Sequence, residues 1–303
     1  MNLKDKIIKL KKEKKAVILA HNYQRSEIQD IADYIGDSIE LSRKAMDEKD
    51  AELIVFAAVD FMAESAAILN PEKKVLLPSL GARCPMAQML TTDEIKRYKI
   101  KYPKAPVVLY VNTLASSKAL CDICCTSANA VEVVNSLKSD TILFGPDRNL
   151  ADYVSDITGK KLITIPEWGF CPTHVLFQPE DVLLLKMKHQ DAVVMVHPEC
   201  SSEMRKIADF VGSTSKMVKF AKNTNAKTII VGTEKGLLYR LQKENPDKVF
   251  IMAYDDAVCP NMKLLTLDNI YSSLKNEKYV IKIPISVAKK ARKALEKMFE
   301  LNN

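Results

Sequence analysis

Glycine is scarce in this chain, with 8 residues among 303, and no stretch has the glycine-rich pattern of a nucleotide-binding loop. No low-complexity linker is present either, so we expect the domains to be fused directly to one another. No apolar run approaches the roughly 18 residues that a membrane-spanning helix needs. The opening segment is lysine-rich and amphipathic rather than a signal peptide. We therefore expect a cytoplasmic protein that does not bind membranes.

Basic residues outnumber acidic ones, at 45 against 38, which gives a formal net charge of +7. The lysines are spread along predicted helices and lack the interleaved aromatic residues of a nucleic-acid-binding surface. We therefore expect a solvated surface and no nucleic-acid partner. The mild positive field would still attract a small anionic substrate.

Three of the seven cysteines stand in the same local setting. Cys84, Cys171 and Cys259 are each followed directly by proline, and each comes shortly after an apolar run. They are spaced by 87 and 88 residues, and a fixed spacing of this kind indicates an internal repeat. In a reducing compartment, cysteines are more often ligands or catalysts than disulfide partners.

Other positions repeat with the same spacing. Steps of 87 residues relate three sets of positions: Tyr23, Tyr110 and His197; Asp60, Asp147 and Glu234; and Ser127 and Thr214. The chain is therefore predicted to contain one α/β unit written three times.

Each unit is predicted to alternate three strands with helices and to end at a Cys-Pro step. The strands are expected at residues 16–20, 53–58, 74–77, 107–111, 141–144, 161–165, 192–196, 228–231 and 249–253. Such alternation implies parallel sheets with right-handed crossovers. We predict three αβα sandwich domains around a pseudo-threefold axis, at residues 1–86, 87–173 and 174–262, with a tail at 263–303 that packs back on the body.

Equivalent loops of the three units would meet at that axis and bring the three cysteines to one point. Three thiolates can hold a metal or an iron–sulfur cluster with one coordination position left open, as a catalytic site requires. The alternative is three buried cysteines without a ligand role, since cysteine packs well as a small apolar residue. All three cysteines occur in the same sequence context and at nearly equal spacing, which favours the ligand interpretation.

Polar residues follow the first strand of each unit, where open parallel sheets place their sites. The three groups are His21-Asn22-Tyr23, Tyr110-Val111-Asn112 and His197-Pro198-Glu199, and Ser38, Ser127 and Thr214 head the helices that follow. Ser38 is predicted to be the N-cap of a helix at 39–47, and Ser286 that of the last helix. Tyr23, His197 and Glu199 would supply acid–base groups, and the helix N-termini would bind a carboxylate or phosphate.

Cys121, Cys124 and Cys125 form a second cysteine group. A Cys-x-x-Cys pair can be redox-active or half of a zinc site, but the sequence has no matching second pair. The interpretation left open is a redox-sensitive pair near the site. Cys200 is expected to be a packed free thiol.

Ten short motifs, taken together, are highly specific: HNYQ (21–24), GDS (36–38), YVN (110–112), TSAN (126–129), GPDRNL (145–150), WGFCPTH (168–174), HPEC (197–200), GSTS (212–215), GTEKG (232–236) and CPNM (259–262). On these motifs the sequence resembles the quinolinate synthase family, the A protein of NAD biosynthesis, over essentially the whole chain. Some relatives have a Cys-x-x-Cys-x-x-Cys near the last of these cysteines, and this chain does not.

The resemblance implies one 4Fe-4S cluster per chain, held by three cysteines, whose open iron acts as a Lewis acid. The implied reaction condenses iminoaspartate with dihydroxyacetone phosphate to quinolinate, with loss of phosphate and two waters. The resemblance also suggests transfer of iminoaspartate from an aspartate-oxidising enzyme.

Carried over by motif, the site residues fall into three sets. The cluster ligands are Cys84, Cys171 and Cys259; the catalytic residues are Tyr23, Tyr110, His197 and Glu199; and the substrate-binding residues are His21, Ser38, Tyr110, Val111, Asn112, Ser127, His174, His197, Pro198, Glu199, Ser213 and Thr214.

Two other classes of protein were weighed. A non-enzymatic iron–sulfur carrier or sensor is the main alternative, but a carrier uses four protein ligands and has no need of a polar cavity. A three-repeat binding protein with structural zinc is disfavoured because structural zinc closes its shell with four protein ligands.

Overall fold

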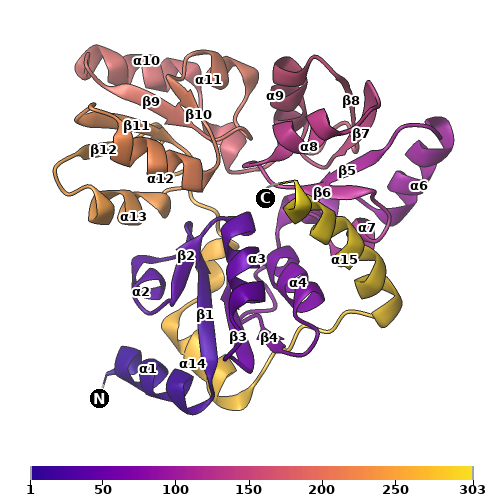
Figure 1. Ribbon diagram of the computed structural model, residues 1–303. Coiled ribbons are helices and arrows are strands. Elements are labelled where there is room, and N and C mark those ends of the chain that lie inside the picture. The colour runs from indigo at the N-terminus through magenta and orange to yellow at the C-terminus, as the bar shows by residue number, and fades with distance from the viewer. Residues whose placement is uncertain (1, 302–303) are drawn as a thin grey trace.

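The computed structural model describes residues 2–301. It contains three four-stranded sheets in which all neighbouring strands are parallel. Figure 1 shows the three α/β units grouped around a common centre. The predicted fold class, repeated αβα units with parallel sheets, is confirmed.

The three units have the same strand order. The first sheet runs β2-β1-β3-β4 and its unit contains α1 (Leu3–Glu13), β1 (Ala16–His21), α2 (Ser26–Gln29), β2 (Tyr34–Gly36), α3 (Ser38–Asp47), β3 (Leu53–Ala57), α4 (Asp60–Leu69) and β4 (Lys74–Leu76). The second sheet runs β6-β5-β7-β8 and its unit contains α5 (Pro85–Met89), α6 (Thr92–Lys101), β5 (Val107–Tyr110), α7 (Ala115–Lys118), β6 (Ile123–Cys125), α8 (Ala130–Ser136), β7 (Thr141–Gly145), α9 (Arg148–Thr158) and β8 (Lys161–Thr164). The third sheet runs β10-β9-β11-β12 and its unit contains η1 (His174–Leu176), α10 (Pro179–Lys188), β9 (Val193–Val196), α11 (Ser202–Lys206), β10 (Phe210–Val211), α12 (Thr214–Asn223), β11 (Thr228–Gly232), α13 (Leu237–Glu244) and β12 (Val249–Met252).

Each sheet has one strand more than the sequence predicted. The additional edge strands β2, β6 and β10 contain only two or three residues, which is too short for an alternating pattern to be recognised. They become strands because the neighbouring first strand supplies hydrogen-bond partners, as in the pairing of His21 with Gly36.

An aspartate fixes the start of the first strand in every unit. In each unit the carboxylate Oδ2 accepts a backbone N–H at 2.7 to 2.8 Å: Asp33 accepts that of Ile18, Asp122 that of Val107 and Asp209 that of Val194. Three residues after these anchor points come His21, Tyr110 and His197, which are therefore equivalent. The predicted equivalence of Tyr23 with Tyr110 and His197 was wrong by two residues in the first unit.

Three helix starts differ from the sequence prediction. Asp37, not Ser38, is the N-cap of α3, and it forms a capping box with Glu40. The helix after Ser127 begins only at Ala130. Ser286 lies inside the last helix, α15 (Ile285–Glu300), which has no side-chain cap.

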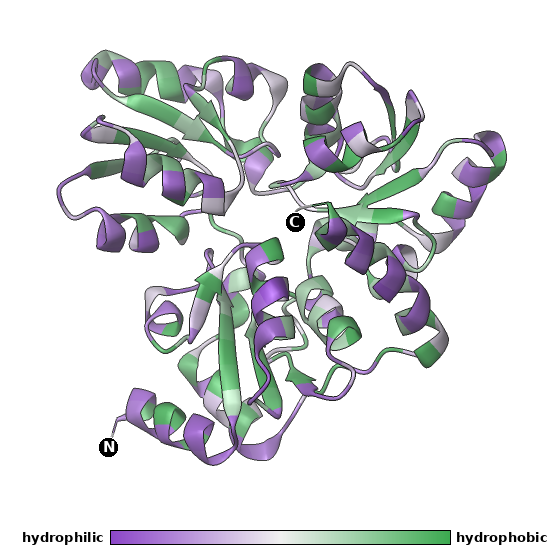
Figure 2. Cartoon of the chain, viewed as in Figure 1, coloured by the Kyte–Doolittle hydropathy of each residue, from purple (hydrophilic) through white to green (hydrophobic). Residues whose placement is uncertain are grey.

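The strands are predominantly apolar, as Figure 2 shows by their hydrophobic colouring against the mixed colouring of the helices, and both strands and helices contribute to the buried core. Leu19, Phe56 and Phe144 are fully buried in a continuous core that extends through the first two units. The third unit has a separate core around residues such as Met195 and Ile230. The first two units are therefore joined more intimately than either is to the third.

The C-terminal segment links the first two units. It contains η2 (Met262–Leu264), α14 (Leu267–Asn276) and α15. Helix α14 packs on α1 and β3, whereas α15 contacts α4 of the first unit and α7 and β6 of the second. Arg292 of α15 donates a hydrogen bond to Leu69 O at 2.9 Å, and Lys297 donates one to Asp122 O at 3.0 Å. Each sheet lies within one predicted domain, and the domain boundaries themselves stay predictions.

Replacing Leu295 with alanine is expected to lower the free energy of unfolding by about 2–5 kcal/mol, because this fully buried side chain of α15 lies in the shared core. Denaturant unfolding measures the change. Ile285→Ala, at a side chain that is 79% exposed on the same helix, is the control and should change stability by less than about 0.5 kcal/mol. Equal effects of the two substitutions would contradict a bracing role for α15.

Candidate active site

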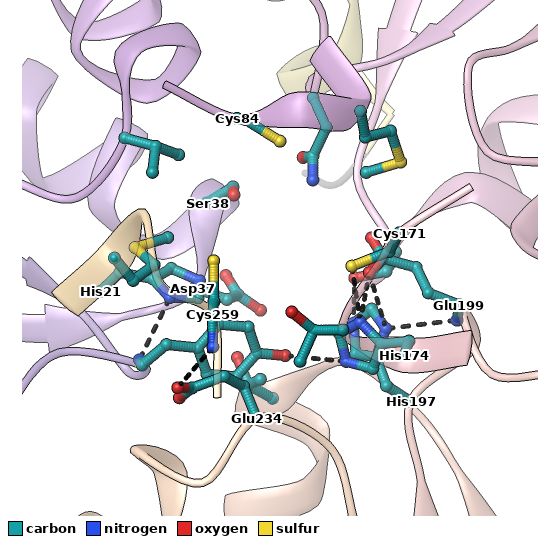
Figure 3. Close-up of a pocket in the computed structure, with 18 of the residues that line it drawn as sticks. His21, Asp37, Ser38, Cys84, Cys171, His174, His197, Glu199, Glu234 and Cys259 are labelled. Carbon is teal, nitrogen blue, oxygen red and sulfur yellow. Dashed lines mark hydrogen bonds and ion pairs between the residues drawn. The ribbon is translucent and has the colours of Figure 1, made fainter. Parts of the chain in front are cut away.

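A short helical turn follows each of the three cysteines at the centre of the molecule. Cys84 is the N-cap of α5 and Pro85 its first residue, a position that suits proline because its missing N–H has no partner there. The turns η1 and η2 start three residues after Cys171 and Cys259. Figure 3 shows the three sulfur atoms directed toward the same open space.

A cavity occupies this centre and encloses about 700 Å³ between its lining atoms, its opening to solvent included. Most of the predicted site residues line it: Cys84, Cys171, Cys259, His21, Tyr23, Ser38, Tyr110, Asn112, Ser127, His174, His197, Glu199 and Thr214. These residues come from all three units, so the cavity exists only when the units are packed together.

Three predicted substrate-binding residues do not line the cavity. Val111 directly follows β5, and its backbone N–H donates a hydrogen bond to Cys125 O. The backbone carbonyl of Pro198 accepts a hydrogen bond from the Arg205 guanidinium at 3.5 Å. Ser213 caps α12 and donates a hydrogen bond to Asp37 at 3.1 Å.

A chain of hydrogen bonds joins a tyrosine to a carboxylate across the floor of the cavity. The Tyr23 hydroxyl lies 2.6 Å from Thr233 Oγ1, which lies 2.9 Å from His174 Nε2. On its other side, His174 Nδ1 lies 2.7 Å from Glu199 Oε2. Hydroxyl and imidazole groups can each donate and accept, so this chain can move a proton between Tyr23 and Glu199.

The histidines at the strand ends are held by the backbone. Nδ1 of His21 accepts the N–H of Tyr23 at 3.2 Å, and Nδ1 of His197 accepts that of Glu199 at 3.3 Å. These bonds fix Nδ1 as an acceptor, which leaves the proton of each neutral ring on Nε2. The Nε2 of His197 lies 3.2 Å from Ser127 Oγ and can therefore donate to it.

Burial controls the protonation of these groups. It lowers the pKa of His21 and of His197 to about 3, so both are neutral at pH 7. Burial also raises the pKa of the Tyr23 and Tyr110 phenols well above 10, and the Glu199 carboxylate adds to both shifts.

Glu199 is the ionised group of the cavity. Burial acts to raise its pKa, but His197 and His174, and hydrogen bonds from His174 and Tyr110, outweigh burial and lower the pKa to about 2. Glu199 is thus a buried carboxylate that accepts hydrogen bonds from His174 and Tyr110, an arrangement that suits proton transfer at neutral pH.

One group of side chains is compact enough to hold a single metal ion. Among residues 2–301, the ligand atoms of Cys171, His174 and Glu199 all lie within 4.8 Å of one another. Cys171 Sγ is 3.1 Å from His174 Nδ1, so the thiol is hydrogen-bonded to the histidine that also contacts Glu199.

Several residues of the site were not singled out from the sequence. Thr233, fully buried between Tyr23 and His174, is the most important, and Asp37 lines the cavity. Glu234, which the sequence marked only as a repeated position, also lines it. Position is the signal that could have found Thr233, because it directly follows β11 at the end where the other site residues lie.

The second cysteine group is separate from the cavity. Cys121 and Cys124 have sulfur atoms 3.8 Å apart, and neither lines the cavity, although Thr126 and Ser127, which follow them in the chain, do. A redox-sensitive role for this pair stays a prediction. Cys200 is fully buried as a free thiol, as predicted, with its sulfur 3.4 Å from Gly232 O.

Fold and site together define an α/β enzyme of three related units, with a central cavity that gathers three cysteines and an acid–base network. The family described as quinolinate synthetase A protein matches residues 5–300 of this chain. The chain belongs to this family.

Proteins named quinolinate synthase are similar over their whole length. The protein from Thermodesulfovibrio yellowstonii is 52% identical over 98% of this chain and 97% of its own. The one from Pyrococcus horikoshii is 52% identical over 100% of both chains, and the one from Thermotoga maritima is 51% identical over 98% of this chain and 99% of its own. Within residues 2–301, no helix has the length and apolar character required to traverse a bilayer.

His21 and His197 are each expected to contribute a loss of stability to the metal-free protein when the pH falls from 7 to 5, because both are neutral in the cavity. Their pKa is about 3 when folded against 6.5 for the free side chain, so below pH 6.5 the unfolded chain binds more protons. Each histidine then costs roughly 2 kcal/mol of stability at pH 5.

Denaturant unfolding at the two pH values measures this loss. His197→Asn should reduce the loss, whereas His189→Asn, at an exposed histidine, should leave it unchanged. If His197→Asn kept the full pH dependence, the neutral-histidine assignment would be wrong.

Proposed function

We propose that this chain is a quinolinate synthase of NAD biosynthesis that condenses iminoaspartate with dihydroxyacetone phosphate. The products are quinolinate, phosphate and two waters. The observation that carries the proposal is the convergence of Cys84, Cys171 and Cys259, one from each unit, on a cavity that also contains a buried acid–base network.

The cysteines suit a multi-iron cluster better than a single ion. Three thiolates on one zinc ion would have sulfur atoms about 3.8 Å apart, given the usual Zn–S bond length. The three sulfur atoms do not form a group within 4.8 Å among the described residues, although all three face the same space. A 4Fe-4S cluster spans a larger distance and takes a cysteine at each of three irons.

The chemistry of the thiols also fits such a cluster. Burial raises the pKa of Cys84, of Cys171 and of Cys259, so each thiol stays protonated unless a nearby cationic centre stabilises the thiolate. When bound, the cluster would supply an iron without a cysteine ligand as a Lewis acid for dehydration.

The helix ends at the cavity provide sites for the anionic groups of both substrates. Ser38 is the first residue of α3 and Thr214 the first of α12, and both line the cavity. Free backbone N–H groups at a helix N-terminus bind carboxylate and phosphate; in α3 the Asp37 side chain already accepts those of Ile39 and Glu40, which leaves the Ser38 end of the helix for an anion. Asn22 donates a hydrogen bond to Thr214 Oγ1 at 2.8 Å and so orients this hydroxyl.

The hydrogen-bonded chain from Tyr23 through Thr233 and His174 to Glu199 performs the proton transfers. The neutral Tyr23 phenol can donate its proton to a leaving hydroxyl, and Thr233 returns a proton to it from His174. His174 gives up this proton from the imidazolium form, which an earlier proton abstraction through the same chain would produce and which ionised Glu199 stabilises, and the ring is neutral afterwards. Because the cavity is buried, bulk water competes little with these transfers.

The alternative of an iron–sulfur carrier or sensor does not account for this network. A carrier needs electron transfer and no proton relay, whereas four cavity side chains here are linked by hydrogen bonds. We further propose that the enzyme works in the cytoplasm and receives iminoaspartate from an aspartate-oxidising enzyme.

Cys84→Ser, Cys171→Ser and Cys259→Ser are each expected to abolish retention of iron and sulfide together with turnover. Wild-type protein prepared without oxygen should contain about four irons per chain. Cys200→Ser removes a buried thiol outside the cavity and should retain iron. Zinc, or no metal, in well-folded wild-type protein would overturn the cluster.

Thr233→Val is expected to lower kcat for quinolinate formation by about 10²–10⁴-fold while iron content stays normal, because valine keeps the shape but breaks the relay between Tyr23 and His174. Thr233→Ser restores the hydroxyl and should recover most of the rate. A Thr233→Val enzyme with wild-type kcat would remove this residue from the mechanism.

A further inference from the structure

In each unit an acidic residue follows the third strand in chain order. It precedes the cysteine by a nearly constant number of residues. The separations are 24 or 25 residues: Asp60 before Cys84, Asp147 before Cys171 and Glu234 before Cys259. None of these acids has a role in the hydrogen-bonded relay or in substrate binding as proposed above. Their repetition in all three units calls for a common explanation.

In the first and third units the acid binds the backbone of the cysteine. Asp60 Oδ1 accepts the N–H of Cys84 at 2.9 Å, and Glu234 Oε1 accepts the N–H of Cys259 at 3.1 Å. Both cysteines are therefore fixed at their nitrogen by a side chain from a different loop.

The second unit has the same elements in a looser arrangement. Asp147 is fully buried, and its Oδ1 accepts the Leu150 N–H at 2.7 Å. Its Oδ2 has no hydrogen-bond partner among the described residues. Burial raises the pKa of Asp147, and the Cys171 backbone N–H is one of the groups that act in the opposite direction. A buried carboxylate oxygen without a partner is costly, so a donor is expected to approach it.

A second bond clamps the same two loops in every unit. The carbonyl two residues before the cysteine accepts a backbone N–H from the acidic segment at 2.8 to 2.9 Å: Ala82 from Asp60, Gly169 from Arg148 and Ala257 from Lys235. At Gly169 the approach is so close that a Cβ would lie 1.9 Å from Pro146 O. The loops are thus in register in the second unit as well.

This arrangement leaves the cysteine side chain little freedom. The following proline restricts the backbone of the cysteine to extended conformations, and Cys84 has φ −76° and ψ 118°. With its nitrogen held by the acid and its carbonyl side held by proline, only rotation about χ1 remains to direct the sulfur. Side chains that orient metal ligands in this way commonly affect metal affinity strongly.

We propose that Asp60, Asp147 and Glu234 are positioning residues that direct the three cysteine sulfurs toward the cluster by binding the cysteine N–H groups. The inference rests on the proposed function, in that it assumes a cluster at this site. In the second unit, the Cys171 N–H binds Asp147 Oδ2 when the cluster is in place.

Replacing aspartate with asparagine is expected to have different effects on cluster retention at position 60 and at position 147. Asp60→Asn keeps one carbonyl oxygen, which suffices for the cysteine because Oδ1 accepts both the Phe61 and the Cys84 N–H. The oxygen that becomes NH₂ is Oδ2, which accepts from Gln88 Nε2 at 3.0 Å and not from the cysteine. Asp147→Asn also keeps one oxygen, but Leu150 occupies it, and the amide NH₂ left facing Cys171 cannot accept a hydrogen bond. Asp147→Asn should therefore weaken the cluster, and Asp60→Asn should not.

The experiment measures the rate at which an iron chelator removes iron from anaerobically prepared protein. Asp147→Asn and Asp60→Ala should lose iron about 10–100-fold faster than wild type, and Asp60→Asn at close to the wild-type rate. Asp33→Ala is the matched control, because Asp33 also accepts a backbone N–H in the first unit but anchors a strand start instead of a cysteine. Thermal unfolding of the metal-free variants shows whether each one folds.

The outcomes separate the two proposals. Wild-type protein without iron and sulfide would overturn the proposed function. A wild type that holds its cluster, with Asp147→Asn and Asp60→Ala losing iron at the wild-type rate, would overturn the positioning role alone. Equal acceleration in Asp60→Asn and Asp147→Asn would assign the effect to lost charge and would also overturn positioning.

Discussion

The structure depends on one geometric constraint, which is that the three units present their cysteine loops to a single space. A parallel sheet delivers its loops at the carboxyl ends of its strands, and in this chain those ends meet at the centre in all three units. No unit contains the site by itself. The site residues His21, Tyr110 and His197 occupy equivalent positions, and yet they act together because each contributes from a different direction.

The three units share a fold, but they contribute chemically different side chains to the site. The equivalent strand ends carry two histidines and one tyrosine, and burial keeps all three neutral at pH 7. Glu199 stays ionised, because His174 and Tyr110 donate hydrogen bonds to it. A buried carboxylate at one end of the relay and a phenol at the other give the proton relay a direction, which three identical units would not provide.

Much of this could be predicted from the sequence, and the failures have physical causes. The strands with long apolar runs were placed within a residue or two, and thirteen predicted site residues line the cavity. The edge strand β10 was missed because its two residues form a strand only through pairing with β9. Thr233 was missed because its neighbours in the relay, Tyr23 and His174, come from segments far away in the chain.

Periodic spacing and apolar runs are local properties of the chain, so the repeat, the parallel α/β class and the three Cys-Pro loops can be predicted from the amino-acid order. Which side chains exchange a proton, and which are held in place, depends on how the three units pack. The tertiary structure paired Tyr23 with Thr233, and it turned the carboxylates of Asp60 and Glu234 toward the cysteine backbone. Hydrogen bonds act over about 3 Å, and that proximity is set by the packing of units whose contacting residues are far apart in sequence.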